Sequence, residues 1–185
     1  MAAVQLTELE SCTLSVIRSY QPCSAYEVRQ VFARSVTPEW SGSTGAIYPV
    51  VNRLLKQGLA RKRSAAGDRR RRADLTVTQN GERAIFAWVT TLEPRHATST
   101  PDPIRTRSSF LGLLPSNEHR ARFISAAEAL TAEMAEEVRK QAETERETDK
   151  SAYIATLGAL FQLEARLRWL STARALLQLP KRKVA

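Results

Sequence analysis

Basic side chains are concentrated in one short stretch of this 185-residue sequence. Seven of them fall within twelve positions, opposed only by Asp68. They are Arg61, Lys62, Arg63, Arg69, Arg70, Arg71 and Arg72. Because so many like charges repel one another unless a polyanion faces them, the stretch predicts contact with nucleic-acid phosphates. A solvated basic segment without a partner is the alternative.

Residues 41–58, just before this stretch, carry polar side chains that could read base edges. Their apolar residues repeat at helical spacing, which predicts a helix with one face in the core. These residues are Ile47, Val50, Val51, Leu54 and Leu55. The exposed face is expected to carry the candidate DNA contacts Ser43, Thr44, Gly45, Tyr48, Asn52, Arg53 and Lys56. Asparagine can pair with adenine and arginine with guanine through two hydrogen bonds. Gly45 would let the backbone approach closely.

Three of these side chains also have a structural interpretation. Tyr48 could pack at the edge of the core, and Arg53 could pair with an acidic neighbour. Lys56 could be an ordinary solvated lysine. The sequence leaves these alternatives open.

The same helix is expected to begin at Ser41 or Ser43 and to end at Gly58, because glycine tolerates the positive φ of a helix end. Pro49 is expected about one and a half turns into the helix. The missing N–H of a proline there would bend the helix locally.

Two shorter helices are predicted before this one. Thr7 and Glu10 have the spacing of a capping box at the start of a helix over 6–20, and Ser24 and Glu27 repeat that spacing. The first helix should bury the face formed by Leu9, Cys12, Thr13, Val16, Ile17 and Tyr20. The second should bury its apolar residues only in part, namely Tyr26, Val28, Val31 and Phe32. Pro38 is expected to end it.

A hairpin and a fourth helix follow. Alternation predicts strands over Leu59–Ser64 and Arg71–Val77, joined by a turn. Thr78 is expected to cap a helix whose core face carries Ile85, Trp88, Val89 and Leu92. The order helix, helix, helix, hairpin, helix predicts a winged helix-turn-helix domain at 5–92.

The second half has a different composition. Residues 93–103 hold three prolines and form an expected linker. Long helices are predicted over about 116–148 and 151–177, within a helical dimerisation domain at 104–179 and before a basic tail at 180–185. A hairpin of two such helices leaves apolar stripe uncovered, so a second copy of the chain is expected to cover it. The dimer contacts expected are Leu130, Met134, Leu160, Leu163, Leu167 and Leu170.

Three aromatic residues of the last helix are candidates for an effector pocket. They are Tyr153, Phe161 and Trp169. Packing in a dimer core is the alternative for all three.

Charge and composition narrow the function further. The net charge is +9 and the pI about 10.1, and residues 1–92 carry 13 basic but only 7 acidic side chains. No signal peptide or apolar run long enough for a transmembrane helix is present, so a cytoplasmic protein without a membrane partner is expected. Cys12 and Cys23 are expected to be buried, with a redox switch as the alternative. No catalytic arrangement, metal-ligand spacing or cofactor motif is found, which predicts a protein that is not an enzyme.

Several motifs resemble those of the PadR family of transcriptional regulators. The third-helix motif of that family is similar to residues 43–49, STGAIYP, followed by Arg53-Leu54 and Gly58-Leu59. Its second-helix motif resembles residues 24–28, SAYEV, with Ala25 where glycine is usual. Residues 78–81, TQNG, resemble the T-x-x-G after its wing. The returning strand departs from the family pattern, because Leu75 stands where tyrosine is usual and the basic residues are shifted toward the wing tip.

This resemblance implies a dimeric DNA-binding regulator of the repressor type. Family members often respond to phenolic acids or hydrophobic drugs, so a small-molecule effector is a further expectation. The fold expected is mainly α with a small β-hairpin, and the partners expected are double-stranded DNA and a second copy of the chain. The alternative is a winged-helix module that binds another protein without reading DNA.

Overall fold

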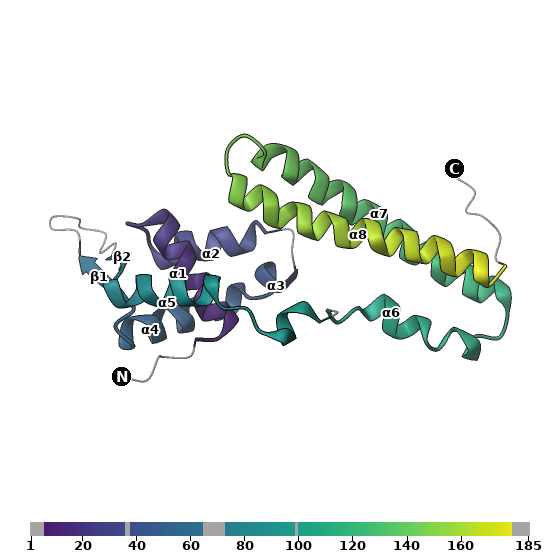
Figure 1. The fold of residues 1–185 in the computed structure, drawn as a ribbon, viewed down its shortest axis with the longest axis horizontal. Helices are drawn as coiled ribbons and strands as arrows, with labels where there is room; N and C mark the ends of the chain where they lie inside the picture. The colour runs from purple at the N-terminus through teal and green to yellow at the C-terminus, as the bar shows by residue number, and fades with distance from the viewer. Residues whose placement is uncertain (1–5, 36–37, 65–72, 99, 179–185) are drawn as a thin grey trace. The chain divides into compact units, whose positions relative to one another are not determined.

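The structure is a computed structural model that describes residues 6–35, 38–64, 73–98 and 100–178. The chain forms two compact units, Met1–Thr98 and Ser99–Ala185. In Figure 1 the first runs from purple to teal and the second from teal to yellow. Within the described ranges, no helix is both long and apolar enough to cross a membrane.

The first unit contains helices around one two-stranded sheet. Its elements in chain order are α1 (Glu8–Tyr20), α2 (Ala25–Ala33), α3 (Pro38–Ser41), the 3-10 helix η1 (Thr44–Ala46), α4 (Ile47–Lys56), β1 (Ala60–Ser64), β2 (Ala73–Val77), α5 (Gln79–Thr90) and the 3-10 helix η2 (Pro94–Ala97). The predicted order of helices and hairpin is confirmed. The short helix α3 was not predicted. Pro38 was expected to end the second helix, but α2 ends at Ala33 and Pro38 begins α3, as proline at a first helical position does. Trp40 of α3 stacks on Phe32 with ring centroids 4.8 Å apart.

The predicted caps of α1, α2 and α5 are present. Thr7 with Glu10, and Ser24 with Glu27, form complete capping boxes, and Thr78 accepts a hydrogen bond from the backbone N–H of Gly81. These bonds satisfy N–H groups that a helix start leaves without partners.

The predicted start of α4 was wrong. Its N-cap is Ala46, which makes no side-chain cap bond, because the chain enters α4 through η1. Pro49 is therefore the third residue of α4. The first four N–H groups of a helix have no intrahelical partner, so the missing donor costs no helix bond and gives no reason for the expected bend.

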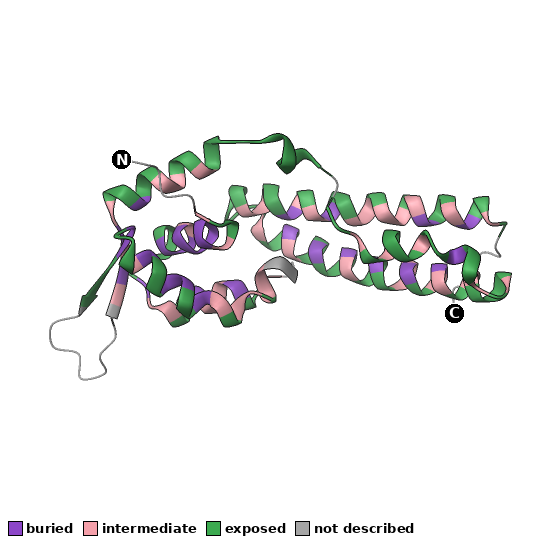
Figure 2. Ribbon diagram, turned by 90° about the horizontal axis from the view of Figure 1, so that it is seen from below, coloured by how far each residue is buried: buried purple, intermediate pink, exposed green. Residues whose placement is uncertain are grey.

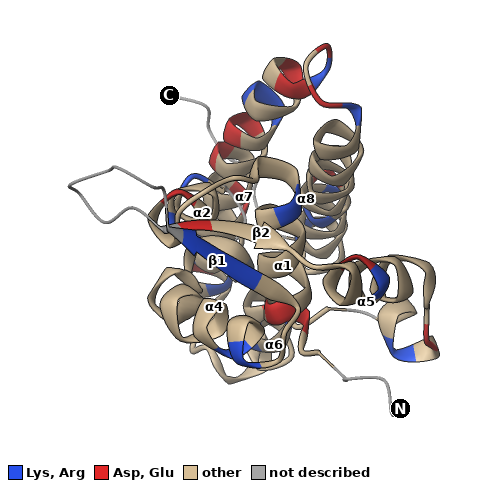
Figure 3. Ribbon diagram, turned by 90° about the vertical axis from the view of Figure 1, so that its left-hand side faces the viewer, with Lys and Arg blue, Asp and Glu red and all other residues tan. Residues whose placement is uncertain are grey.

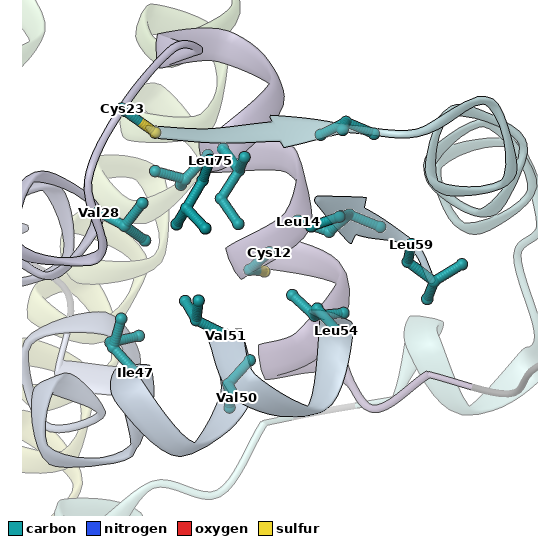
Figure 4. Close-up of a cluster of buried hydrophobic side chains, with 14 of the residues drawn as sticks. Cys12, Leu14, Cys23, Val28, Ile47, Val50, Val51, Leu54, Leu59 and Leu75 are labelled. Atoms are coloured by element: carbon teal, nitrogen blue, oxygen red, sulfur yellow. The ribbon is translucent and has the colours of Figure 1, made fainter. Parts of the chain in front are cut away.

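The core of the first unit lies between α1, α4 and the sheet (Figure 4). From α4 it receives Ile47, Val50, Val51 and Leu54, as predicted, and from α1 it receives Cys12, Leu14, Val16 and Ile17. Two expectations at the edges were wrong. Tyr20 is 58% exposed, and on α5 only Ala84, Ile85 and Trp88 pack on the core, whereas Val89 and Leu92 are 62% and 83% exposed. Leu92 lies beyond the end of α5, so the helical spacing used to place it does not apply.

Strands β1 and β2 pair antiparallel, with Ala60 opposite Val77 and Lys62 opposite Leu75. The backbone of Cys23, between α1 and α2, forms an isolated antiparallel bridge to Leu75 of β2. Its N–H donates to the carbonyl oxygen of Leu75 over 3.3 Å, and its own carbonyl oxygen accepts from the Leu75 N–H over 2.7 Å. The N–H of Val77 donates to the side-chain oxygen of Gln21 over 2.8 Å. These bonds fix the hairpin to the segment that joins the first two helices.

The second unit is a helical hairpin with two short helices before it. Its elements are α6 (Pro103–Ser108), the 3-10 helix η3 (Leu111–Leu113), α7 (Asn117–Glu145) and α8 (Lys150–Leu176). Both long helices were predicted within a few residues of these bounds, and the two short ones were not. Helices α7 and α8 run antiparallel, since Glu128, Arg139 and Glu145 of α7 bond to Arg174, Glu164 and Thr156 of α8.

The buried surfaces of α7 and α8 face each other along the hairpin (Figure 2). Leu170 is fully buried and packs with Ile124, Ala127 and Leu111. Leu160 is also buried, at 6% exposure, whereas Leu130 is 65% exposed. Two of the residues expected to contact a second copy of the chain, Leu160 and Leu170, are therefore already buried within one chain. The sequence pattern did not indicate how much of α7 faces α8, because the buried face of α7 includes the small residues Thr131, Ala135 and Ala142.

Gly81 permits a close approach of α5 to Leu59, the residue before β1, and to Val77 of β2, and its replacement supplies a test of this packing. A Cβ at Gly81 would overlap the carbonyl oxygen of Leu59 and lie 2.6 Å from Cγ1 of Val77. We expect Gly81→Ala to lower the free energy of unfolding by about 1–3 kcal/mol, the usual cost of overpacking. The matched control is Gly158→Ala in α8, where an added Cβ meets nothing within 4 Å. This control should raise stability by roughly 0.5–1 kcal/mol. Urea unfolding of both variants measures the difference, and equal effects would contradict the packing.

Candidate nucleic-acid interface

Helices α2 and α4 form the helix-turn-helix pair, and α4 presents a polar face away from the core. Tyr48 is 46% exposed, and Asn52 and Lys56 are exposed on the following two turns. Residues four apart lie on one side of a helix, so these three form one ridge. Gly45 precedes the ridge in η1, and a Cβ added there would meet nothing within 4 Å. Ser43 and Thr44 are half-buried beside it. The structure therefore brings the predicted α4 residues to one surface.

Arg53 has a partner on α1. Its Nε donates to Oε1 of Glu10 over 2.7 Å, so the acidic-neighbour interpretation of this arginine is correct. Glu10 is only 6% exposed, and its Oε2 accepts from the backbone N–H and the hydroxyl of Thr7 over 2.9 and 3.0 Å. The hydrogen bond from the Thr7 backbone, followed by that from Arg53, lowers the pKa of the Glu10 carboxyl below its usual 4.5. The sequence suggested Glu10 only as a capping residue.

The hairpin, which follows α4 in the sequence, carries a group of exposed basic side chains. Arg61, Lys62 and Arg63 are all exposed on β1, which is the blue strand of Figure 3. Arg61 Nε donates to the hydroxyl of Thr76 over 3.0 Å, and Arg63 lies opposite Asp74 in the register. The four arginines Arg69, Arg70, Arg71 and Arg72 lie outside the described residues.

One candidate contact was missed at the start of α2. Tyr26 was expected to be partly buried, but it is 55% exposed. Val28 and Phe32, one turn apart, are the buried residues of α2 and define its core side. Tyr26 lies two residues before Val28, about 200° around the helix, which places it on the outer side. That spacing is the signal that could have found it.

The two cysteine thiols are in surroundings that make them unreactive. Both are buried and unpaired, and burial raises the pKa of each thiol to about 11. A thiol with that pKa is almost entirely protonated near neutral pH, and the thiolate is the reactive form. In the described part of the chain, no group of three or more His, Cys, Asp or Glu residues could hold a metal ion.

The three aromatic effector candidates are spread along α8. Tyr153 and Trp169 are half-buried, and Phe161 is 58% exposed. Sixteen residues separate Tyr153 from Trp169, which is roughly 24 Å along a helix axis. One small-molecule pocket in a single chain therefore cannot include all three. Trp169 packs beside the Leu170 cluster of the second unit.

The Glu10 carboxylate predicts a pH dependence of stability. A carboxyl whose pKa is lowered by folding stabilises the fold above its unfolded pKa, near 4.5, and loses that contribution as pH falls through the folded value. We expect Glu10→Gln to lower the free energy of unfolding at pH 7 by an amount on the order of 1 kcal/mol, since the half-exposed Arg53 is screened by solvent. Urea unfolding at pH 7 and pH 3 should show this difference shrinking in acid. Glu133→Gln, at an exposed position of α7, is the control, and a pH-independent difference for Glu10→Gln would contradict the assignment.

Comparisons with known proteins bear on the same residues. Residues 13–87 match the family model described as the transcriptional regulator PadR-like family. No curated protein matches the sequence significantly. The structure of Bacillus subtilis PadR in complex with operator DNA is similar, with a TM-score of 0.78 and 16% identity over 93% of this chain and 99% of that one.

Two further solved structures are similar over nearly the whole chain. Bacillus subtilis PadR in complex with p-coumaric acid has a TM-score of 0.75 and 15% identity, over 95% of this chain and 100% of that one. A PadR-like transcriptional regulator from Bacillus cereus has a TM-score of 0.70 and 17% identity, over 96% and 99%. The TM-scores and coverages establish the shared fold, and the family match covers α2, α4 and the hairpin. Residues 13–87 of this chain are therefore similar to the PadR-like family of transcriptional regulators, and the fold is shared with solved PadR structures over nearly the whole chain.

Proposed function

We propose that this protein is a sequence-specific DNA-binding regulator of transcription that acts as a homodimer in the cytoplasm. The observation that carries the proposal is the exposed polar ridge of α4, placed in the chain directly before a basic hairpin, in a winged helix-turn-helix similar to that of the PadR-like family. The structurally similar Bacillus subtilis PadR has been solved in complex with operator DNA. The proposed role is binding rather than catalysis.

The two parts of the interface have different tasks. In a helix-turn-helix the second helix lies in the major groove, where base edges are read, and the first crosses the backbone. This assigns base contacts to the ridge of Tyr48, Asn52 and Lys56, and a backbone contact to Tyr26 on α2. Arginine and lysine side chains of the hairpin supply phosphate contacts, which give affinity without sequence information.

A winged-helix module that binds another protein is the competing function. Protein interfaces deplete charged residues at their core. Arg61, Lys62 and Arg63 are exposed together on one strand, and this clustering favours a polyanion over a protein partner.

Dimerisation is proposed through the second unit. Apolar side chains on it remain largely exposed in one chain, which favours a further contact. They include Leu130 at 65%, Ile154 at 69% and Phe161 at 58% exposure. The expected contacts Met134, Leu163 and Leu167 are half-buried in one chain and could be covered further. A dimer would present two α4 helices to two half-sites of an operator.

Repression relieved by a small hydrophobic or phenolic effector is the regulatory form that we propose. Its support is the solved complex of Bacillus subtilis PadR with p-coumaric acid, a protein of the same fold. In this chain Phe161 is the most exposed of the three aromatic candidates on α8.

Salt dependence of DNA binding tests the proposed function. Each phosphate neutralised contributes a slope of about −0.9 to the plot of log affinity against log salt concentration. We expect a steep slope for the wild type on duplex DNA, measured by fluorescence anisotropy. Arg61→Ala/Arg63→Ala should flatten it by up to about two such increments and weaken binding to all sequences alike.

The control for this experiment removes the same charge elsewhere. Arg122 and Arg139 are exposed on α7 and pair there with acidic neighbours. Arg122→Ala/Arg139→Ala should leave the slope unchanged. An identical slope for wild type and the hairpin variant would refute a phosphate-binding role for Arg61 and Arg63.

The proposed dimer is tested by mass in solution. Sedimentation of the wild type at micromolar concentration should give twice the chain mass of 20.7 kDa. Leu130→Glu places a charge on the exposed apolar surface and should shift the protein toward monomer with its helical circular dichroism retained. Lys140→Glu, an exposed polar position of α7, is the control. A monomeric wild type at that concentration would rule out the dimer.

A further inference from the structure

The ion pair between Glu10 and Arg53 leaves part of the arginine available. Arg53 uses its Nε for Glu10, and its two terminal nitrogens make no hydrogen bond within the part of the chain that the structure describes. Its side chain is 51% exposed, and Asn52 beside it on α4 is exposed as well. Four of the five N–H groups of the guanidinium therefore remain as donors.

The carboxylate that holds Arg53 is itself held. Glu10 is almost fully buried, and the capping box fixes its Oε2 through Thr7 while Oε1 faces Arg53. A side chain anchored in this way loses little further freedom when it binds a ligand, which favours directional hydrogen bonding. The negative charge beside it also offsets the attraction of Arg53 for any phosphate.

We propose that Glu10 is a positioning residue that holds Arg53 for bidentate reading of a guanine in the major groove. The two terminal nitrogens of an arginine match the O6 and N7 acceptors of guanine, which is the commonest specific contact to a base. Arg53 is thereby assigned a base contact, and α1 contributes to sequence specificity without touching DNA. This inference rests on the proposed DNA-binding function.

In vitro selection from a randomised duplex pool, followed by affinity measurements on the selected sites, tests the proposal. The wild type should select a motif containing a guanine whose replacement weakens binding roughly 5- to 150-fold, the range of a bidentate contact. Arg53→Ala should abolish discrimination at that position alone. Glu10→Gln should reduce it while other positions keep their preference, because glutamine retains the capping box but removes the charge that holds Arg53.

Two further variants separate positioning from stability. Ser116→Ala removes the side-chain cap of α7 in the second unit and leaves Thr7, Glu10 and Arg53 unchanged, so it should lower the melting temperature without changing the motif. In an Arg53→Ala background, Glu10→Gln should have no additional effect on the guanine preference, because Glu10 acts through Arg53.

Each outcome decides a separate point. An unchanged motif for Arg53→Ala, or for Glu10→Gln, would overturn the inference while the proposed function stands. Equal loss of affinity on every sequence for Arg53→Ala would also overturn it, since that is the behaviour of a phosphate contact. A wild type that selects no motif would overturn the proposed function, and the inference with it.

Discussion

The carbonyl group of Leu59 is the point on which the geometry of the first unit depends. The N–H of Leu59 donates to the carbonyl oxygen of Leu54 over 3.0 Å and that of Gly58, at φ +68°, donates to Leu55, which closes the end of α4. The carbonyl oxygen of Leu59 accepts from both the N–H and the hydroxyl of Thr78, over 3.0 and 3.1 Å, at the start of α5. Gly81 packs against the same carbonyl. The end of α4, the start of β1 and the start of α5 therefore meet at this peptide, which connects α4 to the hairpin.

Both defined positions of the T-x-x-G motif, the threonine and the glycine, are explained by the contacts of Leu59. The hydroxyl of Thr78 donates toward the carbonyl oxygens of Gly58 and Leu59, over 2.7 and 3.1 Å, and accepts from the Gly81 N–H at the start of α5. The residue three places after Thr78 must have no Cβ. Such a motif is informative because it specifies a junction of two segments, whereas a periodic apolar stripe specifies only one helix. Resemblance of residues 78–81 to the family pattern was therefore a sound basis for predicting the fold.

The sequence predicted those features of the fold that depend only on residues close to one another in the chain. The capping boxes at Thr7 and Ser24, the stripe of α4 and the helix end at Gly58 depend on neighbours a few residues away, and all were predicted. The pairing of Glu10 with Arg53 joins residues 43 positions apart, and the sequence offers several acidic partners for any arginine. The exposure of Val89 depends on what covers α5, which a helical period does not specify. Leu170 was expected to be covered by a second copy of the chain, but Ile124 and Ala127 of α7, with Leu111, already cover it within one chain. Which partner covers an apolar stripe is not specified by its spacing.

Charge divides the candidate interface into two chemically different parts. On α4, the one arginine is balanced by a buried carboxylate, so its electrostatic attraction for phosphate is small and its hydrogen-bond geometry matters more. On β1, Arg61 bonds to a neutral hydroxyl, and its positive charge is retained for a polyanion. Affinity that comes from uncompensated charge is independent of sequence and falls with salt, whereas discrimination comes from directional contacts to bases. In the proposed function, the hairpin would therefore supply affinity for any DNA sequence, and α4 would supply the selection of a site.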